Sequence, residues 1–240
     1  MAINSNLLRR RPSDRNLFLA AAIFFPLIVL IGYFKSYYFN AFFDFPPVAN
    51  SLVHAHGIVM SIWVIYFVAQ VALVRSKNIK LHITMGFAGI AIAAIVIVVG
   101  MATAYDSQFV RRAAPTGNDP LEFFIIPAGD MLLFAIFFAG AIYYRKRSLE
   151  HKSLMLMTAI NFLPAALFRI PVVPPEFALW FAFSVPGLIA IACVIRQRFK
   201  FGKLNYVFAA AALLYIIALP LRLVFAKTWI WHGFTNLLAP

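Results

Sequence analysis

Acidic residues, cysteines and charges of any kind are scarce in this chain of 240 residues. Asp and Glu total eight, and charged residues make up 12% of the sequence, about half of the roughly 25% found in an average soluble protein. Hydrophobic residues reach 63%. A chain with so few charges cannot cover itself with a water-compatible surface, which excludes an ordinary soluble domain.

Cysteine and histidine are also few. The single cysteine, Cys193, excludes an internal disulfide and a cysteine-rich metal site. The five histidines are too few for di-iron chemistry built on histidine clusters. Any bound metal would therefore depend on histidine, on a carboxylate or on a prosthetic group.

Long apolar runs are what the sequence does contain. A helix that crosses the roughly 30 Å hydrocarbon core needs about 20 mostly apolar residues. The sequence therefore predicts an all-α, polytopic helix bundle, a single membrane domain over residues 1–240 with about seven transmembrane helices. The predicted spans are 17–34, 51–74, 83–105, 121–144, 153–170, 177–195 and 204–226.

The basic residues predict the orientation of this bundle. The net charge is +13, but the cations form short clusters between apolar runs, so they indicate topology rather than nucleic-acid binding. Fifteen of the 21 Lys and Arg residues fall in the segment before the first predicted span and in every second connection after it. Because cytoplasmic connections are enriched in Lys and Arg, we expect the amino terminus in the cytoplasm and the carboxyl terminus outside.

Two histidines lie at the cytoplasmic ends of different predicted helices. His82 opens the third span and His151 opens the fifth, so both are expected at the same depth. Such a pair is what a b-type haem or a bridging metal ion requires, since each helix supplies one nitrogen. The alternative is a pair of solvated histidines at helix starts.

The second predicted span carries a polar stripe. His56, Trp63 and Gln70 are spaced by seven residues, which places them on one helix face. His54 points about 200° away from His56 and is expected at the membrane interface. Either the stripe is a packed face, with Gln70 bonded to a neighbouring helix, or His56 binds a metal or a proton and the stripe lines a cofactor site.

Asp130 is the only carboxylate well within a predicted span, about nine residues or roughly 13 Å from its outer end. One hypothesis is an ion pair with Arg169 or Arg222 that fixes helix packing. The other is a functional site with His56, in which the two side chains bind a metal ion and Asn161 extends the site inward. We expect an outer polar cluster made of His54, Asp130, Asn161, Arg169 and Arg222.

Three short motifs carry a resemblance to known proteins. They are His54-Ala55-His56-Gly57 continuing to Gln70, Leu81-His82-x-x-x-Gly86, and His151-Lys152-x-Leu154-Met155. Over the second to fifth spans the chain resembles uncharacterised bacterial multi-pass membrane proteins. It is also similar to membrane proteins of cytochrome oxidase assembly and to b-type membrane cytochromes. The resemblance implies a bacterial inner membrane and, as partners, other membrane subunits of a respiratory complex.

The sequence thus predicts a redox-associated membrane protein that binds or handles haem, quinone or metal through intramembrane histidines. At most one bis-histidine haem is expected, at His82 and His151. The alternative is a non-catalytic accessory subunit or small carrier whose histidines pack or bind protons. The pattern leaves open whether the protein is an enzyme.

Overall fold

Helices make up nearly all of the computed structural model, which describes residues 15–115 and 117–239 and contains no strand in these ranges. The predicted all-α class is therefore confirmed. The α-helices are α1 (Arg15–Tyr33), α2 (Ser51–Arg75), α3 (Ile79–Tyr105), α4 (Pro120–Phe123), α5 (Ile125–Tyr143), α6 (Ser148–Ile160), α7 (Leu163–Leu167), α8 (Pro175–Phe201), α9 (Tyr206–Ala226) and α10 (Trp229–Leu238). Three shorter turns are η2 (Phe34–Tyr38), η3 (Asn40–Phe42) and η4 (Asp106–Val110).

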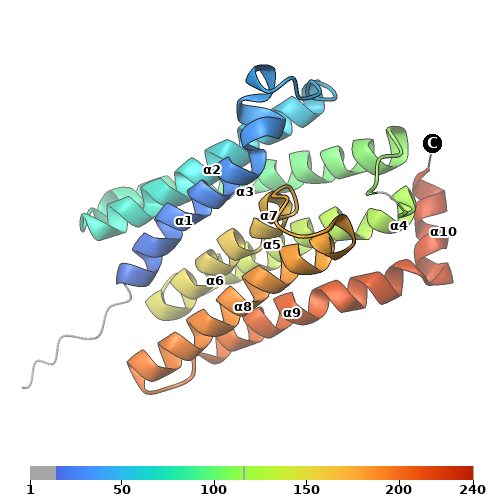
Figure 1. Cartoon of the computed structure of the whole chain (residues 1–240). Helices are drawn as coiled ribbons and strands as arrows, with labels where there is room; N and C mark the ends of the chain where they lie inside the picture. Colours follow the sequence, from blue (N-terminus) through green and yellow to red (C-terminus); the bar gives the residue numbers. More distant parts are fainter. Residues whose placement is uncertain (1–14, 116, 240) are drawn as a thin grey trace, which may run out of the picture.

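Six helical segments of residues 15–115 and 117–239 are long and apolar enough to cross a membrane. They lie side by side in Figure 1 and present many hydrophobic side chains outward, among them Ile65, Leu132 and Leu213. Such a surface suits lipid rather than water, and the protein is a multi-pass membrane protein. The segments are Arg15–Tyr38, Ser51–Arg75, Ile79–Val110, Pro120–Tyr143, Pro175–Phe201 and Tyr206–Ala226.

The remaining predicted span, 153–170, is not a continuous helix. It divides into α6 and α7 at Asn161 and Phe162, where the sequence analysis predicted one uninterrupted helix. Pro164 favours the break, because proline has no N–H for the carbonyl of Ile160 and its ring clashes with that carbonyl. Most of the segment is buried inside the bundle, so its irregular backbone is shielded from lipid.

The divided segment still runs between the two ends of the bundle. At its start, the Nδ1 atom of His151 lies 2.8 Å from the carbonyl oxygen of Ala141, near the end of α5. At its finish, α7 packs so closely on the far end of α1 that a Cβ atom on Gly32 would clash with the backbone of Ala166. This path is compatible with the expected seven crossings.

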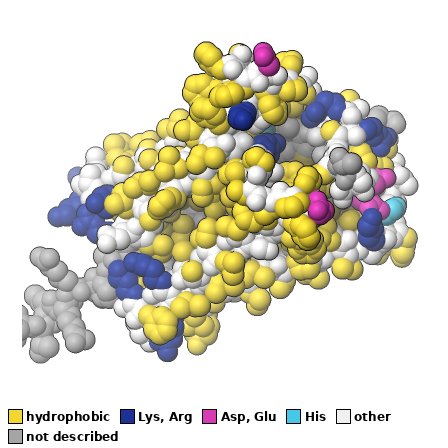
Figure 2. Space-filling view, in the orientation of Figure 1, with side chains coloured by type: hydrophobic (Ala, Val, Ile, Leu, Met, Phe, Trp, Pro, Cys, Tyr) yellow, Lys and Arg dark blue, Asp and Glu magenta, His cyan; other side chains and the backbone are white. Residues whose placement is uncertain are grey.

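The charges separate along the bundle as the orientation argument expects. Lys and Arg gather at the end where α1 begins, whereas most Asp and Glu lie toward the other end, which we call the acidic end (Figure 2). At the cationic end, Arg15 donates a 3.0 Å hydrogen bond to the carbonyl oxygen of Arg75. The predicted cations Arg9, Arg10 and Arg11 lie outside the described residues. Helix α1 begins at the cationic end and α10 lies across the acidic end (Figure 1), so the described chain starts and finishes on opposite sides.

An apolar aromatic layer fills the middle of the bundle. Trp63 of α2 is fully buried and packs edge-on against Phe134 and Phe138 of α5. Phe162, at the break between α6 and α7, stacks on Phe134 with ring centroids 4.8 Å apart. This aromatic layer connects α2 and α5 with the break between α6 and α7.

Candidate functional site

The first candidate site is the histidine pair at the cationic end. His82 lies in the first turn of α3, where Asn78 accepts a hydrogen bond from the backbone N–H of Leu81. His151 lies in the first turn of α6. The two ring centroids are 6.3 Å apart and the rings meet edge-on. The structure therefore brings together the two histidines that the sequence placed at one depth.

The surroundings of the Nδ1 atom differ between the two histidines. A carbonyl oxygen only accepts, so the contact with Ala141 requires a proton on Nδ1 of His151 and leaves the lone pair on Nε2. Metal-binding histidines are commonly oriented by such a bond to a backbone carbonyl. The Nδ1 atom of His82 is buried and has no hydrogen-bond partner among the described residues.

The spacing and the donor set restrict what the pair could bind. Histidine nitrogens bind a metal at about 2.0–2.1 Å, so nitrogens on opposite sides of one ion are roughly 4 Å apart and the ring centroids are further apart than that. The observed 6.3 Å is of this order. In residues 15–115 and 117–239, no group of three or more His, Cys, Asp or Glu could hold a metal ion. A haem fits two histidines best, because the protein supplies only the axial ligands.

Open space lies on the same face of α3. Gly86 follows His82 by four residues, and a Cβ atom added to it would meet no atom within 4 Å. Residues four apart share a helix face. A flat group held by His82 would thus meet no obstacle from this next turn of α3.

The polar stripe on α2 packs inside the bundle, as the hypothesis of a packed face predicted, but Gln70 has a different hydrogen-bond partner from the one expected. Gln70 does not bond a neighbouring helix, but donates a 2.9 Å hydrogen bond to the hydroxyl of Tyr66 on its own helix. Tyr66 then donates to the carbonyl oxygen of Met85 on α3 at 3.0 Å and stacks on Trp63. Sequence reasoning missed Tyr66, although its spacing of three and four residues from Trp63 and Gln70 places it on their face.

The second candidate site is a buried ion pair in the acidic half of the bundle. The Nη1 atom of Arg222 lies 2.8 Å from Oδ1 of Asp130, and the two side chains are 9% and 15% exposed. Arg222 also donates to the carbonyl oxygens of Ile126 and Ala218. From the break after α6, Asn161 donates to the backbone oxygen of Asp130 at 2.9 Å. The predicted proximity of Asp130, Asn161 and Arg222 is confirmed.

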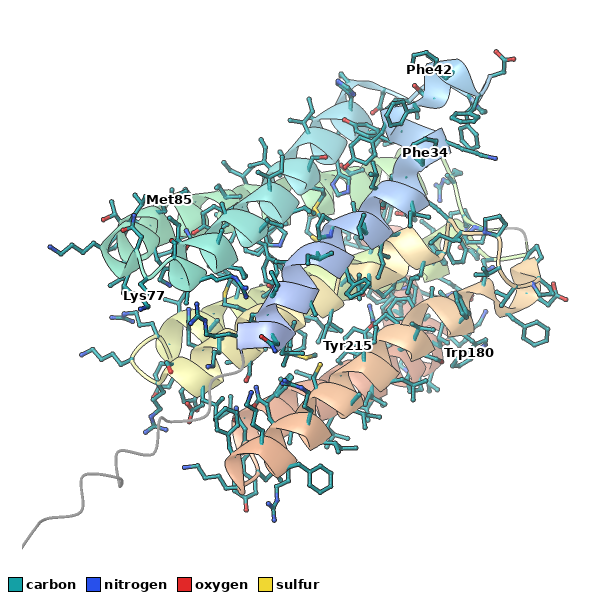
Figure 3. All side chains as sticks on the ribbon, turned by 60° about the vertical axis from the view of Figure 1, so that its left-hand side comes forward. Phe34, Phe42, Lys77, Met85, Trp180 and Tyr215 are labelled. Atoms are coloured by element: carbon teal, nitrogen blue, oxygen red, sulfur yellow. The ribbon has the colours of Figure 1, made fainter. Side chains whose placement is uncertain are left out.

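Several polar atoms at this ion pair lack partners. Within the described residues, no hydrogen bond reaches Oδ1 of Asn161, Nη2 of Arg222 or the hydroxyl of Tyr215, and all three atoms are buried. Tyr215 lies in the bundle interior (Figure 3), within electrostatic range of Asp130. Sequence reasoning missed it, although it precedes Arg222 by seven residues and so shares its helix face.

The other expected members of the outer cluster lie elsewhere. His54 is exposed, and its Nδ1 atom lies 3.3 Å from the hydroxyl of Tyr37. Arg169 was one of the two alternative partners predicted for Asp130, but its guanidinium lies 4.4 Å from the centre of the Tyr33 ring. His56 interacts electrostatically with Arg169, and its Nδ1 atom is buried without a partner in the described chain.

The predicted metal site at His56 and Asp130 gains no support from these positions. Across residues 15–115 and 117–239, no hydrogen bond joins the side chains of His56 and Asp130. The same ranges contain no group of three or more His, Cys, Asp or Glu that could hold a metal ion. Asp130 is instead satisfied by Arg222. Of the two hypotheses for Asp130, the ion pair is the one whose geometry is present.

Comparison of the chain with protein-family models, curated proteins and solved structures finds no match. The resemblance drawn from the three motifs therefore stays a prediction. Function has to be argued from the two sites themselves.

Proposed function

We propose that the protein binds one haem through His82 and His151 at the cationic end of the bundle, and that it acts in electron transfer or haem handling in the bacterial inner membrane. The observation that carries this proposal is the contact of the two imidazole rings across α3 and α6 at 6.3 Å. A haem would supply the redox chemistry, and the chain would supply axial nitrogens and an apolar surrounding. Membrane subunits of a respiratory complex are the proposed partners.

A haem is favoured over a bare metal ion for two reasons. The described residues offer two histidines at this place but no third His, Cys, Asp or Glu in a metal-binding group. The bond from His151 to the carbonyl of Ala141 also holds one ring through Nδ1, so its Nε2 would be the nitrogen available to an axial site.

The test is the absorption spectrum of the protein purified in detergent, recorded oxidised and reduced, after growth with haem supply and after addition of hemin. We expect a haem spectrum with the wild type. His82→Ala and His151→Ala should each abolish it, because each removes one axial ligand. His232→Ala is the matched control and should retain it, since His232 lies at the other end, 3.3 Å from Glu122.

Two results would contradict the proposal: a wild-type protein without haem absorbance before and after hemin addition, or an unchanged spectrum in both histidine variants. The first result, with no metal in elemental analysis, would favour the alternative of an accessory subunit or small carrier. In that case the histidine pair would have a packing role.

A further inference from the structure

Two cavities follow one another along α1. The first, of about 340 Å³, is almost wholly apolar and lies between α1, the divided helix α6–α7 and α8. The second, of about 880 Å³, lies at the acidic end between the end of α1, η2 and the residues after α7. The two cavities are separate, and we call the face of α1 that lines both of them the α1 groove.

The same face of α1 lines both cavities. Leu17, Ala21, Phe24 and Ile28 contribute to the first cavity, and Ile31 continues the row into the second at the same spacing of three or four residues. Ile189 and Cys193 of α8 form the opposite wall of the first cavity. The α1 groove therefore runs along the helix axis, in the direction that an acyl chain takes in a bilayer.

The acidic end of the α1 groove carries two cations. Lys35 and Arg169 both line the second cavity and both are exposed. Arg169 is held in place by the ring of Tyr33 and by a hydrogen bond from Nη1 to the carbonyl oxygen of Ala165. No carboxylate of the described residues forms an ion pair with Lys35 or Arg169. Their charges are thus available to an anion from outside the chain.

The segment beside these cations is rich in aromatic residues, as are protein segments at a membrane interface. Phe34, Phe39, Phe42 and Phe43 contact one another in η2, η3 and the turn after them. Phe42 is 82% exposed and lies at the tip of this segment, farther from the bundle than Phe34 (Figure 3). Exposed aromatic side chains of this kind are enriched at the level of lipid headgroups.

From the charges of Lys35 and Arg169, the apolar walls of the cavities and the aromatic segment beside them, we infer that the α1 groove binds an anionic phospholipid. Its phosphate lies between Lys35 and Arg169, and one acyl chain follows the face of α1 past Ile31 to Ile28. Ser36, whose buried hydroxyl has no partner among the described residues, lies beside the phosphate as a further donor. The inference is independent of the haem proposal, because the phosphate site lies at the opposite end of the bundle from His82 and His151.

The experiment measures lipid retention by native mass spectrometry of the purified full-length protein. Phosphatidylglycerol and phosphatidylcholine with identical acyl chains are titrated separately. We expect stronger retention of phosphatidylglycerol, and about fivefold weaker retention for each of Lys35→Gln and Arg169→Gln, which corresponds to the typical interaction of one cation with an anionic lipid.

The control variants remove the same charge at the same end. Arg112→Gln and Lys227→Gln, made singly, each remove one cation outside the α1 groove and should each change the preference little. Equal retention of the two lipids by the wild type would overturn the inference, as would an equal loss in the control variants.

A second comparison tests the acyl chain. Ile28→Trp places a larger side chain in the α1 groove, whereas Ile23→Trp lies on the same helix but lines neither cavity. Retention of phosphatidylglycerol should fall with Ile28→Trp only. No effect of either tryptophan would show that the headgroup alone is recognised, and an equal loss in both would show a general effect of tryptophan on α1; each result would overturn the groove assignment.

Discussion

The ion pair between Asp130 and Arg222 gives the sharpest prediction about stability. Arg222→Met removes the guanidinium but keeps most of the apolar stem, so it leaves the buried carboxylate of Asp130 without its partner. Breaking a buried pair in this way costs about 3–5 kcal/mol. Asp130→Asn leaves the guanidinium with its bonds to Ile126 and Ala218, and we expect a smaller loss of about 1.5–3 kcal/mol.

The double variant distinguishes an ion pair from two independent residues. With both charges removed, neither is left uncompensated, so Asp130→Asn with Arg222→Met should be more stable than the sum of the single losses by roughly 2–3 kcal/mol. Unfolding can be followed in detergent with a thiol-reactive fluorophore, because the only cysteine, Cys193, is buried at 7% exposure.

The exposed pair of Lys227 and Glu122 is the control for this comparison of single and double variants. Lys227 is 71% exposed in its side chain, and coupling in exposed pairs is about 1 kcal/mol or less. If the losses at Asp130 and Arg222 simply add within about 0.5 kcal/mol, the ion pair does not stabilise the bundle and the reasoning is wrong.

Two further predictions concern topology and packing. A reporter fused after Lys203 should be cytoplasmic and one fused at the carboxyl terminus should be outside; a cytoplasmic result for both would mean that one crossing is miscounted. Gly129→Ala should lower the thermal stability by about 1–3 kcal/mol, because its Cβ would clash with the side chain of Arg222. Gly233→Ala in α10, where a Cβ meets nothing within 4 Å, should be neutral or raise stability by up to about 1 kcal/mol in the same melting experiment.

The sequence predicted the helices well because lipid imposes a simple rule on length and polarity. Each predicted span other than 153–170 corresponds to one of the six apolar helical segments, although 121–144 contains a turn at Phe124 between α4 and α5, and 153–170 divides at Asn161. Pro164 was the residue in the sequence that indicated a break in this helix, but proline also lies inside the uninterrupted helices α1, α8 and α9. What distinguishes the divided helix is its tertiary setting: the amide of Asn161 bonds the backbone of α5, and a sequence does not show that partner.

The candidate sites were predictable in depth but not in direction. Position along a span gives depth by the helical rise, and this sufficed to pair His82 with His151. It did not decide between Arg169 and Arg222 as the partner of Asp130, because that choice depends on how each helix is rotated in the bundle. The structure shows Arg222 facing α5 and Arg169 stacked on α1.

Helix α5 contacts the histidine pair through Ala141 and carries Asp130 of the ion pair. Ala141, which contacts His151, follows Asp130 by eleven residues, or about 16 Å of helix. Between them lies the aromatic layer, in which Phe134 is fully buried against Trp63 and Phe162. These three side chains contain one polar group, the indole N–H of Trp63, and it is buried without a hydrogen-bond partner among the described residues. The histidine pair therefore lies on the cationic side of this aromatic layer along α5, and the Asp130 ion pair lies on its acidic side.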